Sequence, residues 1–257
     1  MTALFDLTGL FDLTGTTAVV TGASRGIGRA MSEALASADA HVVGVSATLA
    51  PGSEVERAIT SAGGSFESVS CDFADPDAVR SLAEDLSLRR VDILVNNAGT
   101  IERAPAADHP ISSWDRVLQV NLTSQFLLTQ QVGRGMLERG RGKIIFTASL
   151  LSFQGGINVP GYTAAKSGIA GLTKALANEW ASGGVNVNAI APGYIATENT
   201  AALRSDPDRS RSILERIPAG RWGQPGDLAG ATLFLASPAS DYVSGIVLPV
   251  DGGWLGR

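Results

Sequence analysis

The sequence predicts an α/β fold in which one parallel sheet of seven strands is covered by helices on both faces, a doubly wound arrangement. Three observations lead to this prediction. Short apolar runs recur along the chain, longer amphipathic stretches separate them, and a glycine-rich turn follows the first run. Near-continuous apolar strands are typical of a sheet that is buried on both faces. No linker or change of composition divides residues 16–257, so we expect a single domain there.

Each expected strand is a short run of β-branched or other apolar residues that ends at a turn signal. The first run, residues 17–21, ends at Gly22, and the fourth ends at the Asn-Asn-Ala-Gly turn of residues 96–99. The expected strands are residues 17–21, 41–45, 65–71, 91–95, 143–148, 185–190 and 246–250.

The stretches between these runs have the spacing of amphipathic helices. Asp75 followed by Pro76 is a typical helix start, because aspartate caps the free amides and proline fits the first turn. Segment 194–222 is long, polar and rich in Arg, Asp and Pro, and it follows the sixth strand, so we expect a substrate lid. The expected helices are residues 26–38, 54–62, 76–88, 113–139, 160–181 and 226–236.

Composition argues against several classes of protein. The 25 acidic and 20 basic residues give a net charge of −5, which does not fit a nucleic-acid-binding protein. Hydrophobic residues make up 44% of the chain, enough for a substantial core. The single cysteine, Cys71, excludes an internal disulfide, and two histidines argue against a zinc site. No apolar run reaches about 18 residues, and no basic stretch precedes the first apolar residues, so we expect a cytoplasmic protein without a membrane partner.

The hexapeptide LFDLTG of residues 4–9 is repeated at residues 10–15. Two copies of this length cannot form a solenoid. We interpret residues 1–15 as a leader whose second copy leads into the domain.

The motif TGASRGIG, residues 21–28, joins the first strand to the first helix. Gly22 permits a tight turn, Gly26 lets the backbone approach a pyrophosphate, and Gly28 allows close packing of the helix. The helix N-terminus adds amide donors and a positive dipole. In this context the motif predicts a nucleotide-binding, Rossmann-like fold. Asp72, after the third strand, either accepts a hydrogen bond from adenine or caps a turn.

Tyr162 and Lys166 lie four residues apart, so on a helix both side chains share one face. A nearby ammonium group lowers the pKa of a tyrosine, which can then exchange a proton with a hydroxyl or carbonyl group. The alternative is a solvated helix face. Ser149 follows the fifth strand at the same edge of the sheet and is placed to hold the reacting oxygen. Asn121 has no capping role within its helix, and is either functional or a hydrogen-bonded core residue.

Together these residues resemble the short-chain dehydrogenase/reductase family over nearly the whole chain, from Thr17 to the Asp-Gly-Gly of residues 251–253. The resemblance implies a catalytic tetrad in which Tyr162 is the acid/base, and Lys166 lowers its pKa and binds the nicotinamide ribose. Ser149 positions the substrate oxygen, and Asn121 holds a water linked to the lysine. It also implies cofactor contacts at Gly22, Ser24, Arg25, Gly26, Ile27, Gly28, Ser46, Asp72, Phe73, Asn97, Ala98, Gly99, Tyr162, Lys166, Pro192, Gly193, Ile195 and Thr197.

Within this family the segments SLLSFQGG, NVNAIAPGYIAT and RIPAGRWG are similar to the sugar-acid enzymes 2-deoxygluconate 3-dehydrogenase (also described as 2-keto-3-deoxygluconate 5-dehydrogenase) and gluconate 5-dehydrogenase. We therefore expect a secondary hydroxyl of a sugar acid to be interconverted with a ketone. Arg103 and Gln154 are placed to bind such a substrate together with Ser149 and Tyr162, although Arg103 could equally be a solvated base.

The end of the second strand, residues 44–48, carries no acid to bind the ribose hydroxyls of NAD. Arg25 could instead meet the 2′-phosphate of NADP, assisted by the hydroxyl of Ser46 or Thr48. NADP is therefore the preferred prediction, and NAD stays open. Two alternatives to a sugar-acid dehydrogenase are a 3-oxoacyl-carrier-protein reductase and a non-catalytic nucleotide-sensing protein. The two long helices resemble those that pair between subunits in this family, and this resemblance implies a homotetramer.

Overall fold

The computed structural model describes residues 7–257 and contains the predicted sheet of seven parallel strands. The strand order is β3-β2-β1-β4-β5-β6-β7, so the direction of winding reverses between β1 and β4. In sheets of this kind ligands bind beyond the carboxyl ends of the strands at that reversal. The strands are β1 Thr17–Thr21, β2 His41–Ser46, β3 Ser65–Ser70, β4 Ile93–Asn96, β5 Gly142–Thr147, β6 Val185–Pro192 and β7 Val247–Val250.

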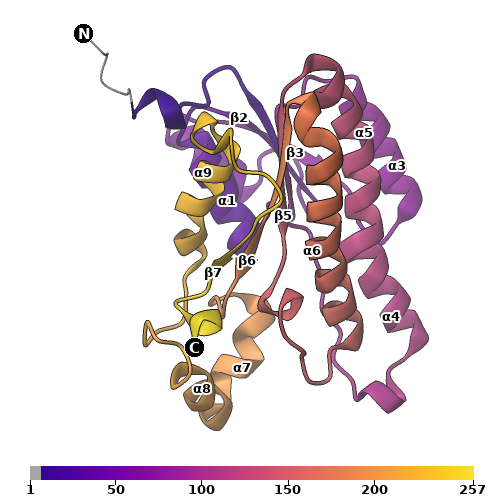
Figure 1. Cartoon of the computed structure of the whole chain (residues 1–257), viewed down its shortest axis with the longest axis vertical. Coiled ribbons are helices and arrows are strands. Elements are labelled where there is room, and N and C mark those ends of the chain that lie inside the picture. The colour runs from indigo at the N-terminus through magenta and orange to yellow at the C-terminus, as the bar shows by residue number, and fades with distance from the viewer. Residues whose placement is uncertain (1–6) are drawn as a thin grey trace.

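Helices cover both faces of the sheet (Figure 1). Successive residues of β1 alternate between two cores: Val19 belongs to one cluster, whereas Ala18 and Val20 belong to the other. The first cluster includes α3 Pro76–Ser87, α5 Ser124–Arg139 and α6 Pro160–Trp180. The second includes α1 Gly26–Ala36, α2 Glu54–Ser61 and α9 Ala229–Ala236. Within residues 7–257 no helix combines the length and the apolar character that a membrane span requires.

The long helix predicted over residues 113–139 is interrupted near its middle. It consists of α4 Ile111–Leu118, a π-helical turn η3 Gln119–Thr123, and α5. In this turn the amide of Ser124 donates to the carbonyl of Gln119, five residues earlier. Such π turns inside α-helices occur frequently at functional sites. Asn121, a residue that is unusual for a helix interior, lies within this π-helical turn.

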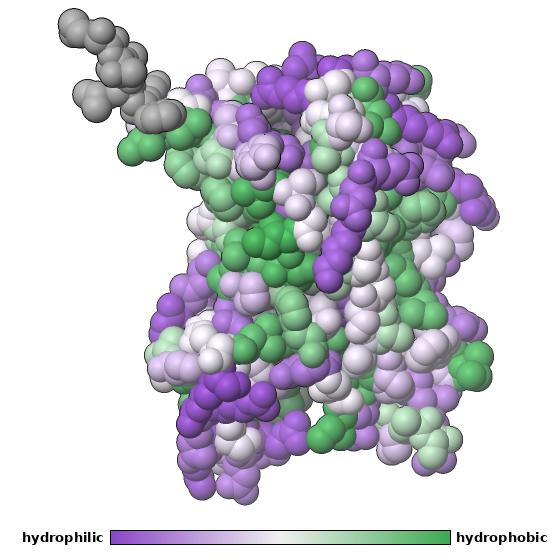
Figure 2. Space-filling model, viewed as in Figure 1, coloured by the Kyte–Doolittle hydropathy of each residue, from purple (hydrophilic) through white to green (hydrophobic). Residues whose placement is uncertain are grey.

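Segment 194–222 is more regular than a loop. It contains η6 Glu198–Thr200, α7 Ala201–Ser205 and α8 Pro207–Leu214. Asp206 caps α8 by accepting from two backbone amides, and Pro207 occupies the first turn, so a very polar sequence still starts a helix. A bridge between Ile195 and Gly223 joins the two ends of the segment. In Figure 1 α7 and α8 lie beyond the carboxyl ends of the strands, and Figure 2 shows their mainly hydrophilic surface.

The second copy of the repeated hexapeptide enters the domain at Leu13. This side chain is 1% exposed and belongs to the core, and its amide donates to the carbonyl of Ala38 at 2.9 Å. A 3-10 turn, η1 Gly9–Phe11, precedes it. Residues 1–6 of the expected leader lie outside the described residues.

Candidate active site

The glycine loop requires glycine at three positions, either because φ is positive or because a side chain would clash. Gly22 and Gly26 have φ of +69° and +56°, in the left-handed region that favours glycine. A Cβ atom on Gly28 would lie 2.1 Å from the carbonyl oxygen of Gly22. Arg25 occupies the N-cap position of α1, and because its guanidinium group has no acceptor, no N-cap side chain satisfies the first amides of the helix, which can bind an anion. Ile27 packs against the core beneath.

The turn after β4 is fastened to the end of β1. The hydroxyl of Thr21 accepts from the amides of Asn97 and Ala98, both at 2.9 Å, and the Asn97 side-chain amide donates to the Thr21 carbonyl at 2.9 Å. Asn97 therefore bridges the backbones of neighbouring strands and holds the glycine loop in place. Gly99 faces Asn121, whose Oδ1 would lie 3.0 Å from a Cβ atom at that glycine.

The carboxyl end of β2 carries hydroxyl groups. Ser46 donates to the hydroxyl of Ser24 in the glycine loop at 3.1 Å. Asp72 accepts from the amide of Ala74 at 2.9 Å, which is the turn-capping alternative considered for this residue. Phe73 is 4% exposed and belongs to the core, and its carbonyl accepts from the hydroxyl of Ser124 at 2.8 Å, so the predicted cofactor contact at Phe73 has little accessible surface.

Tyr162, Ser149 and Lys166 lie together at the carboxyl end of β5. The hydroxyls of Tyr162 and Ser149 are hydrogen-bonded, and Lys166 Nζ lies 5.6 Å from the centre of the tyrosine ring. Lys166 is 2% exposed and donates to the carbonyl of Thr147 at 2.6 Å. Ser149 also accepts from the amide of Leu151 at 3.1 Å, which caps the short turn η4 Leu150–Ser152.

The electrostatics of the tyrosine differ from the sequence-based expectation. Burial raises the pKa of Tyr162, and the hydrogen bond from Ser149 and the charge of Arg103 only partly oppose this rise. Burial lowers the pKa of Lys166 to about 8. The pKa of Tyr162 is therefore raised, and not lowered as the sequence predicts, because desolvation outweighs the Ser149 hydrogen bond and the charge of Arg103. Tyr162 is protonated at neutral pH and ready to donate a proton.

Asn121 is fully buried in the π turn, which packs against α6. Its Nδ2 donates to the carbonyl of Thr100 at 2.7 Å, and its Oδ1 accepts from the amide of Thr100 at 2.8 Å. Both halves of the side chain thus hold the backbone just after the 96–99 turn. These contacts are those of a hydrogen-bonded core residue, and they connect Asn121 to the loop that leads to Arg103.

The predicted substrate contacts lie on two sides of the lid. Arg103 is exposed, donates to the carbonyl of Asn199 at 3.1 Å, and acts electrostatically on Tyr162. Gln154 accepts from Trp254 Nε1 at 3.2 Å and from Arg216 at 3.4 Å. Trp254 and Arg216 are not among the substrate contacts predicted from the sequence, although aromatic residues at both ends of the lid and near the C-terminus were an available signal.

After β6 the chain passes close to both the C-terminal turn and the glycine loop. A Cβ atom on Gly193 would lie 2.6 Å from Asp251 Cα, and one on Gly26 would lie 3.4 Å from Thr197. Pro192 ends the strand, and Ile195 is buried beneath the lid. A cavity of about 250 Å³ lies here, lined by Gly193, Tyr194, Ile195, Ile217, Ala219, Arg221, Gly223, Asp227, Val250, Asp251 and Gly252.

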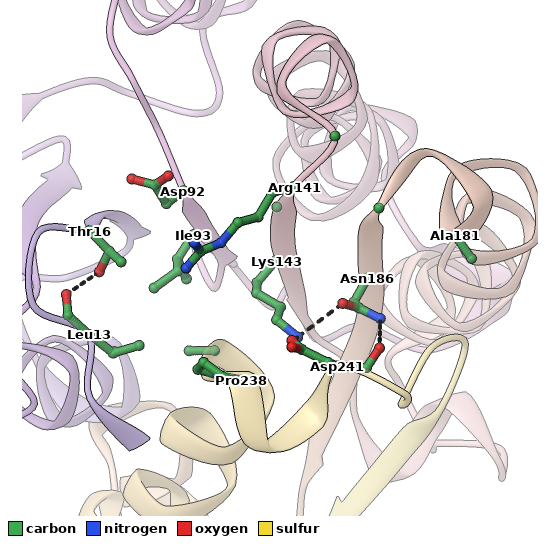
Figure 3. A pocket seen from close by; sticks show the side chains of 14 residues that line it. Leu13, Thr16, Asp92, Ile93, Arg141, Lys143, Ala181, Asn186, Pro238 and Asp241 are labelled. Carbon is green, nitrogen blue, oxygen red and sulfur yellow. Dashed lines mark hydrogen bonds and ion pairs between the residues drawn. The ribbon is translucent and has the colours of Figure 1, made fainter. Parts of the chain in front are cut away.

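A second cavity, of about 450 Å³, lies at the opposite edge of the sheet, among the amino ends of β4, β5 and β6 (Figure 3). Lys143 crosses it to reach Asn186 at 3.0 Å and Asp241 at 2.7 Å. Burial lowers the pKa of Lys143 despite this ion pair. The lysine ties β5 to β6 and to the segment after α9, far from the tyrosine site.

Comparisons with known proteins agree with this geometry. A family model described as enoyl-(acyl carrier protein) reductase matches residues 22–255. The chain is 56% identical to 2-dehydro-3-deoxy-D-gluconate 5-dehydrogenase of Pseudoalteromonas atlantica, over 95% of this chain and 97% of the relative.

Two solved structures are similar over nearly the whole chain. One, from Beutenbergia cavernae, is named as a candidate NAD(P)-dependent gluconate 5-dehydrogenase with bound NADP at low occupancy; it has a TM-score of 0.94 and 52% identity, covering 97% of this chain and 100% of that one. The other, from Agrobacterium tumefaciens, is named as a candidate 2-deoxy-D-gluconate 3-dehydrogenase with bound NADP; it has a TM-score of 0.92 and 53% identity, covering 96% and 99%.

Proposed function

Because the chain belongs to the short-chain dehydrogenase/reductase family, we propose that it is an NADP-dependent dehydrogenase of a sugar acid. The substrate is a gluconate, 2-deoxygluconate or 2-dehydro-3-deoxygluconate type of molecule, and a secondary hydroxyl is interconverted with a ketone. One arrangement carries the proposal: a tyrosine and a serine hydroxyl are hydrogen-bonded beside a buried lysine, and an arginine acts on the same tyrosine. The names of the similar proteins support the choice of sugar acid.

The loop at the end of β1 fits a dinucleotide. Added Cβ atoms at Gly28 and Gly22 would come within 2.1 Å and 2.8 Å of neighbouring protein atoms, so only glycine keeps the turn and the start of α1 this closely packed. The free first turn of α1 suits the pyrophosphate. Ser46 and Ser24 supply hydroxyls where an acid would select NAD, and Arg25 supplies a cation for the 2′-phosphate. We expect Thr197 and the Pro192–Gly193 turn to hold the nicotinamide end.

The chain's own residues supply proton transfer and orientation. Ser149 and Tyr162 bind the reacting oxygen, and Tyr162 gives it a proton when a ketone is reduced or takes one when an alcohol is oxidised. The nicotinamide cofactor, when bound, supplies or accepts the hydride. Lys166, charged below its pKa of about 8, binds the cofactor ribose and stabilises the tyrosinate. Arg103 binds the carboxylate of the substrate.

An acyl-carrier-protein reductase fits this lid less well. Such an enzyme needs a basic surface for an acidic carrier, but the acids Glu198, Asp206, Asp208 and Glu215 lie among the arginines of the lid. A non-catalytic sensor would not need the hydrogen-bonded Tyr162 and Ser149 pair.

We also propose a cytoplasmic homotetramer. The two long helical runs, α4–η3–α5 and α6, support subunit contacts because they resemble the helices that pair between subunits in this family. Figure 2 shows hydrophobic surface around the edge strand β7, and Ile246, directly before this strand, is 39% exposed. An uncovered edge strand favours contact with a second copy of the chain. Light scattering at micromolar concentration tests this, and a monomer would contradict it.

Initial rates test the function. We would measure absorbance at pH 7 and at alkaline pH with NADP or NAD and each of the three sugar acids. Acetoacetyl thioesters with NADPH or NADH serve as the test of the acyl reductase. We expect turnover of a sugar acid and a preference for NADP. Thioester reduction without sugar-acid turnover would overturn the proposed substrate and leave the family assignment intact.

A further inference from the structure

Two arginines hold the first turn of the lid, η6, between the glycine loop and the loop after β4. Arg25 in the glycine loop forms an ion pair with Glu198 at 2.6 Å. From the other side, Arg103 donates to the carbonyl of Asn199 at 3.1 Å. These are the two arginines that the proposed function assigns to the anionic groups of the ligands, the 2′-phosphate and the carboxylate. Both arginines contact the lid in this structure.

The contact between the glycine loop and the lid follows from the backbone and not only from two long side chains. A Cβ atom on Gly26 would lie 3.4 Å from Thr197, so the residues beside Arg25 and Glu198 are already packed together. Among residues 7–257 Glu198 is the sole ion-pair partner of Arg25. The two side chains are 71% and 70% exposed, so a phosphate from solution can reach the guanidinium without unfolding the lid.

We propose that Glu198 is a specificity-determining residue for the cofactor, because its carboxylate competes with the 2′-phosphate for Arg25. This inference rests on the proposed binding of NADP at the glycine loop. A phosphate carries more charge and more acceptor oxygens than a carboxylate, and it displaces Glu198 when it binds. NAD has no 2′-phosphate and leaves the pair intact. Glu198 therefore weakens the binding of NADP selectively, and NADP binding releases one of the two arginine contacts of η6.

Equilibrium binding tests the inference without reference to turnover. We would titrate NADPH and NADH by fluorescence into the wild type, Glu198→Gln, Arg25→Ala and the double variant. An exposed ion pair is weak, so we expect Glu198→Gln to lower the Kd for NADPH by about two- to fivefold. The Kd for NADH should stay unchanged. In the Arg25→Ala background, Glu198→Gln should leave the Kd for NADPH unchanged, because the guanidinium for which the carboxylate and the phosphate compete is absent.

Glu215→Gln is the matched control, because Glu215 is an exposed acid of the same lid that forms no ion pair among the described residues. It should change neither Kd. An unchanged Kd for NADPH in Glu198→Gln would overturn the proposal. If Glu198→Gln still lowers the Kd for NADPH in the Arg25→Ala background, the proposal is also overturned, because Glu198 would then repel the phosphate directly. If instead the wild type binds neither dinucleotide, or Arg25→Ala leaves NADPH binding unchanged, the proposed cofactor site itself is wrong.

Discussion

The indole nitrogen of Trp254 lies 3.2 Å from the side-chain oxygen of Gln154, so the C-terminal turn is hydrogen-bonded to the loop that follows Ser149. Arg216 of the lid stacks on the same indole, 4.1 Å from the ring centre, and also reaches Gln154. Trp254 is 4% exposed. Three segments that are distant in the sequence are therefore joined at one side chain, beside the proposed substrate site.

Trp254→Phe should raise the KM for the sugar acid more than it lowers kcat. The phenyl ring keeps most of the packing and the contact with Arg216, but the donor to Gln154 is lost and the loop after Ser149 becomes less ordered. We expect a loss of stability of about 1 kcal/mol for the missing hydrogen bond. Steady-state kinetics and urea denaturation measure both effects. A variant with unchanged KM would show that this contact does not position the substrate.

The strands were predictable because each is a short, nearly continuous apolar run, and all seven lie at the expected places. The start of β4 at Ile93, two residues later than expected, is the largest shift at the start of a strand. The approximate positions of the glycine loop and of Tyr162 beside Lys166 were also predictable, since both follow from local spacing. Local patterns suffice where the partner groups are neighbours in the sequence.

The remaining features depend on contacts between distant segments. The π turn at Asn121 accompanies two hydrogen bonds to Thr100, which helical periodicity does not reveal. The lid helices are short and polar, so an amphipathic pattern could not reveal them. The direction of the Tyr162 pKa depends on burial, which only the folded chain defines.

Gly28→Ala should abolish dinucleotide binding and destabilise the protein. The new methyl group would lie 2.1 Å from the carbonyl of Gly22, so the glycine loop and α1 must separate. Such overpacking costs about 1–3 kcal/mol. Gly171→Ala is the control, because this exposed glycine of α6 has no neighbour within 4 Å, and alanine there should stabilise the helix by about 0.5–1 kcal/mol. Thermal denaturation and NADPH titration of both variants provide the comparison.

Alkaline pH should favour the oxidation of the alcohol over the reduction of the ketone. Burial raises the pKa of Tyr162, so the tyrosine is a proton donor at pH 7, and reduction should be fastest near neutrality. Oxidation needs the deprotonated tyrosine and should accelerate as pH rises. Rates in both directions from pH 6 to 10 measure this, with Tyr162→Phe as the inactive reference, expected to lose about 10²–10⁴-fold. Equal pH profiles in the two directions would contradict Tyr162 as the acid/base.

Lys166→Met should inactivate the enzyme but stabilise the ligand-free protein at pH 7. The folded state lowers the pKa of this lysine to about 8, so the protonated lysine is penalised by folding at neutral pH. Because the unfolded chain binds the proton more tightly, the wild type gains stability as pH rises from about 8 toward the ordinary lysine pKa of about 10.4. The advantage of the methionine variant should therefore shrink between pH 7 and 9.5. Urea denaturation of both proteins at pH 7 and at pH 9.5 tests this. If the methionine variant is more stable by the same free energy at both pH values, the gain comes from packing alone.

Asn121→Ala should destabilise the protein and displace the loop that carries Arg103. Removing the amide leaves the half-buried carbonyl and amide of Thr100 without their side-chain partner, at a combined cost of about 1–3 kcal/mol. If Asn121 acts by positioning this loop, the KM for the sugar acid rises and the pH profile of kcat keeps its shape. If Asn121 instead takes part in a proton relay, kcat falls at neutral pH while KM stays constant. Asn121→Asp separates the two further, because aspartate still accepts from the Thr100 amide but cannot donate to its carbonyl.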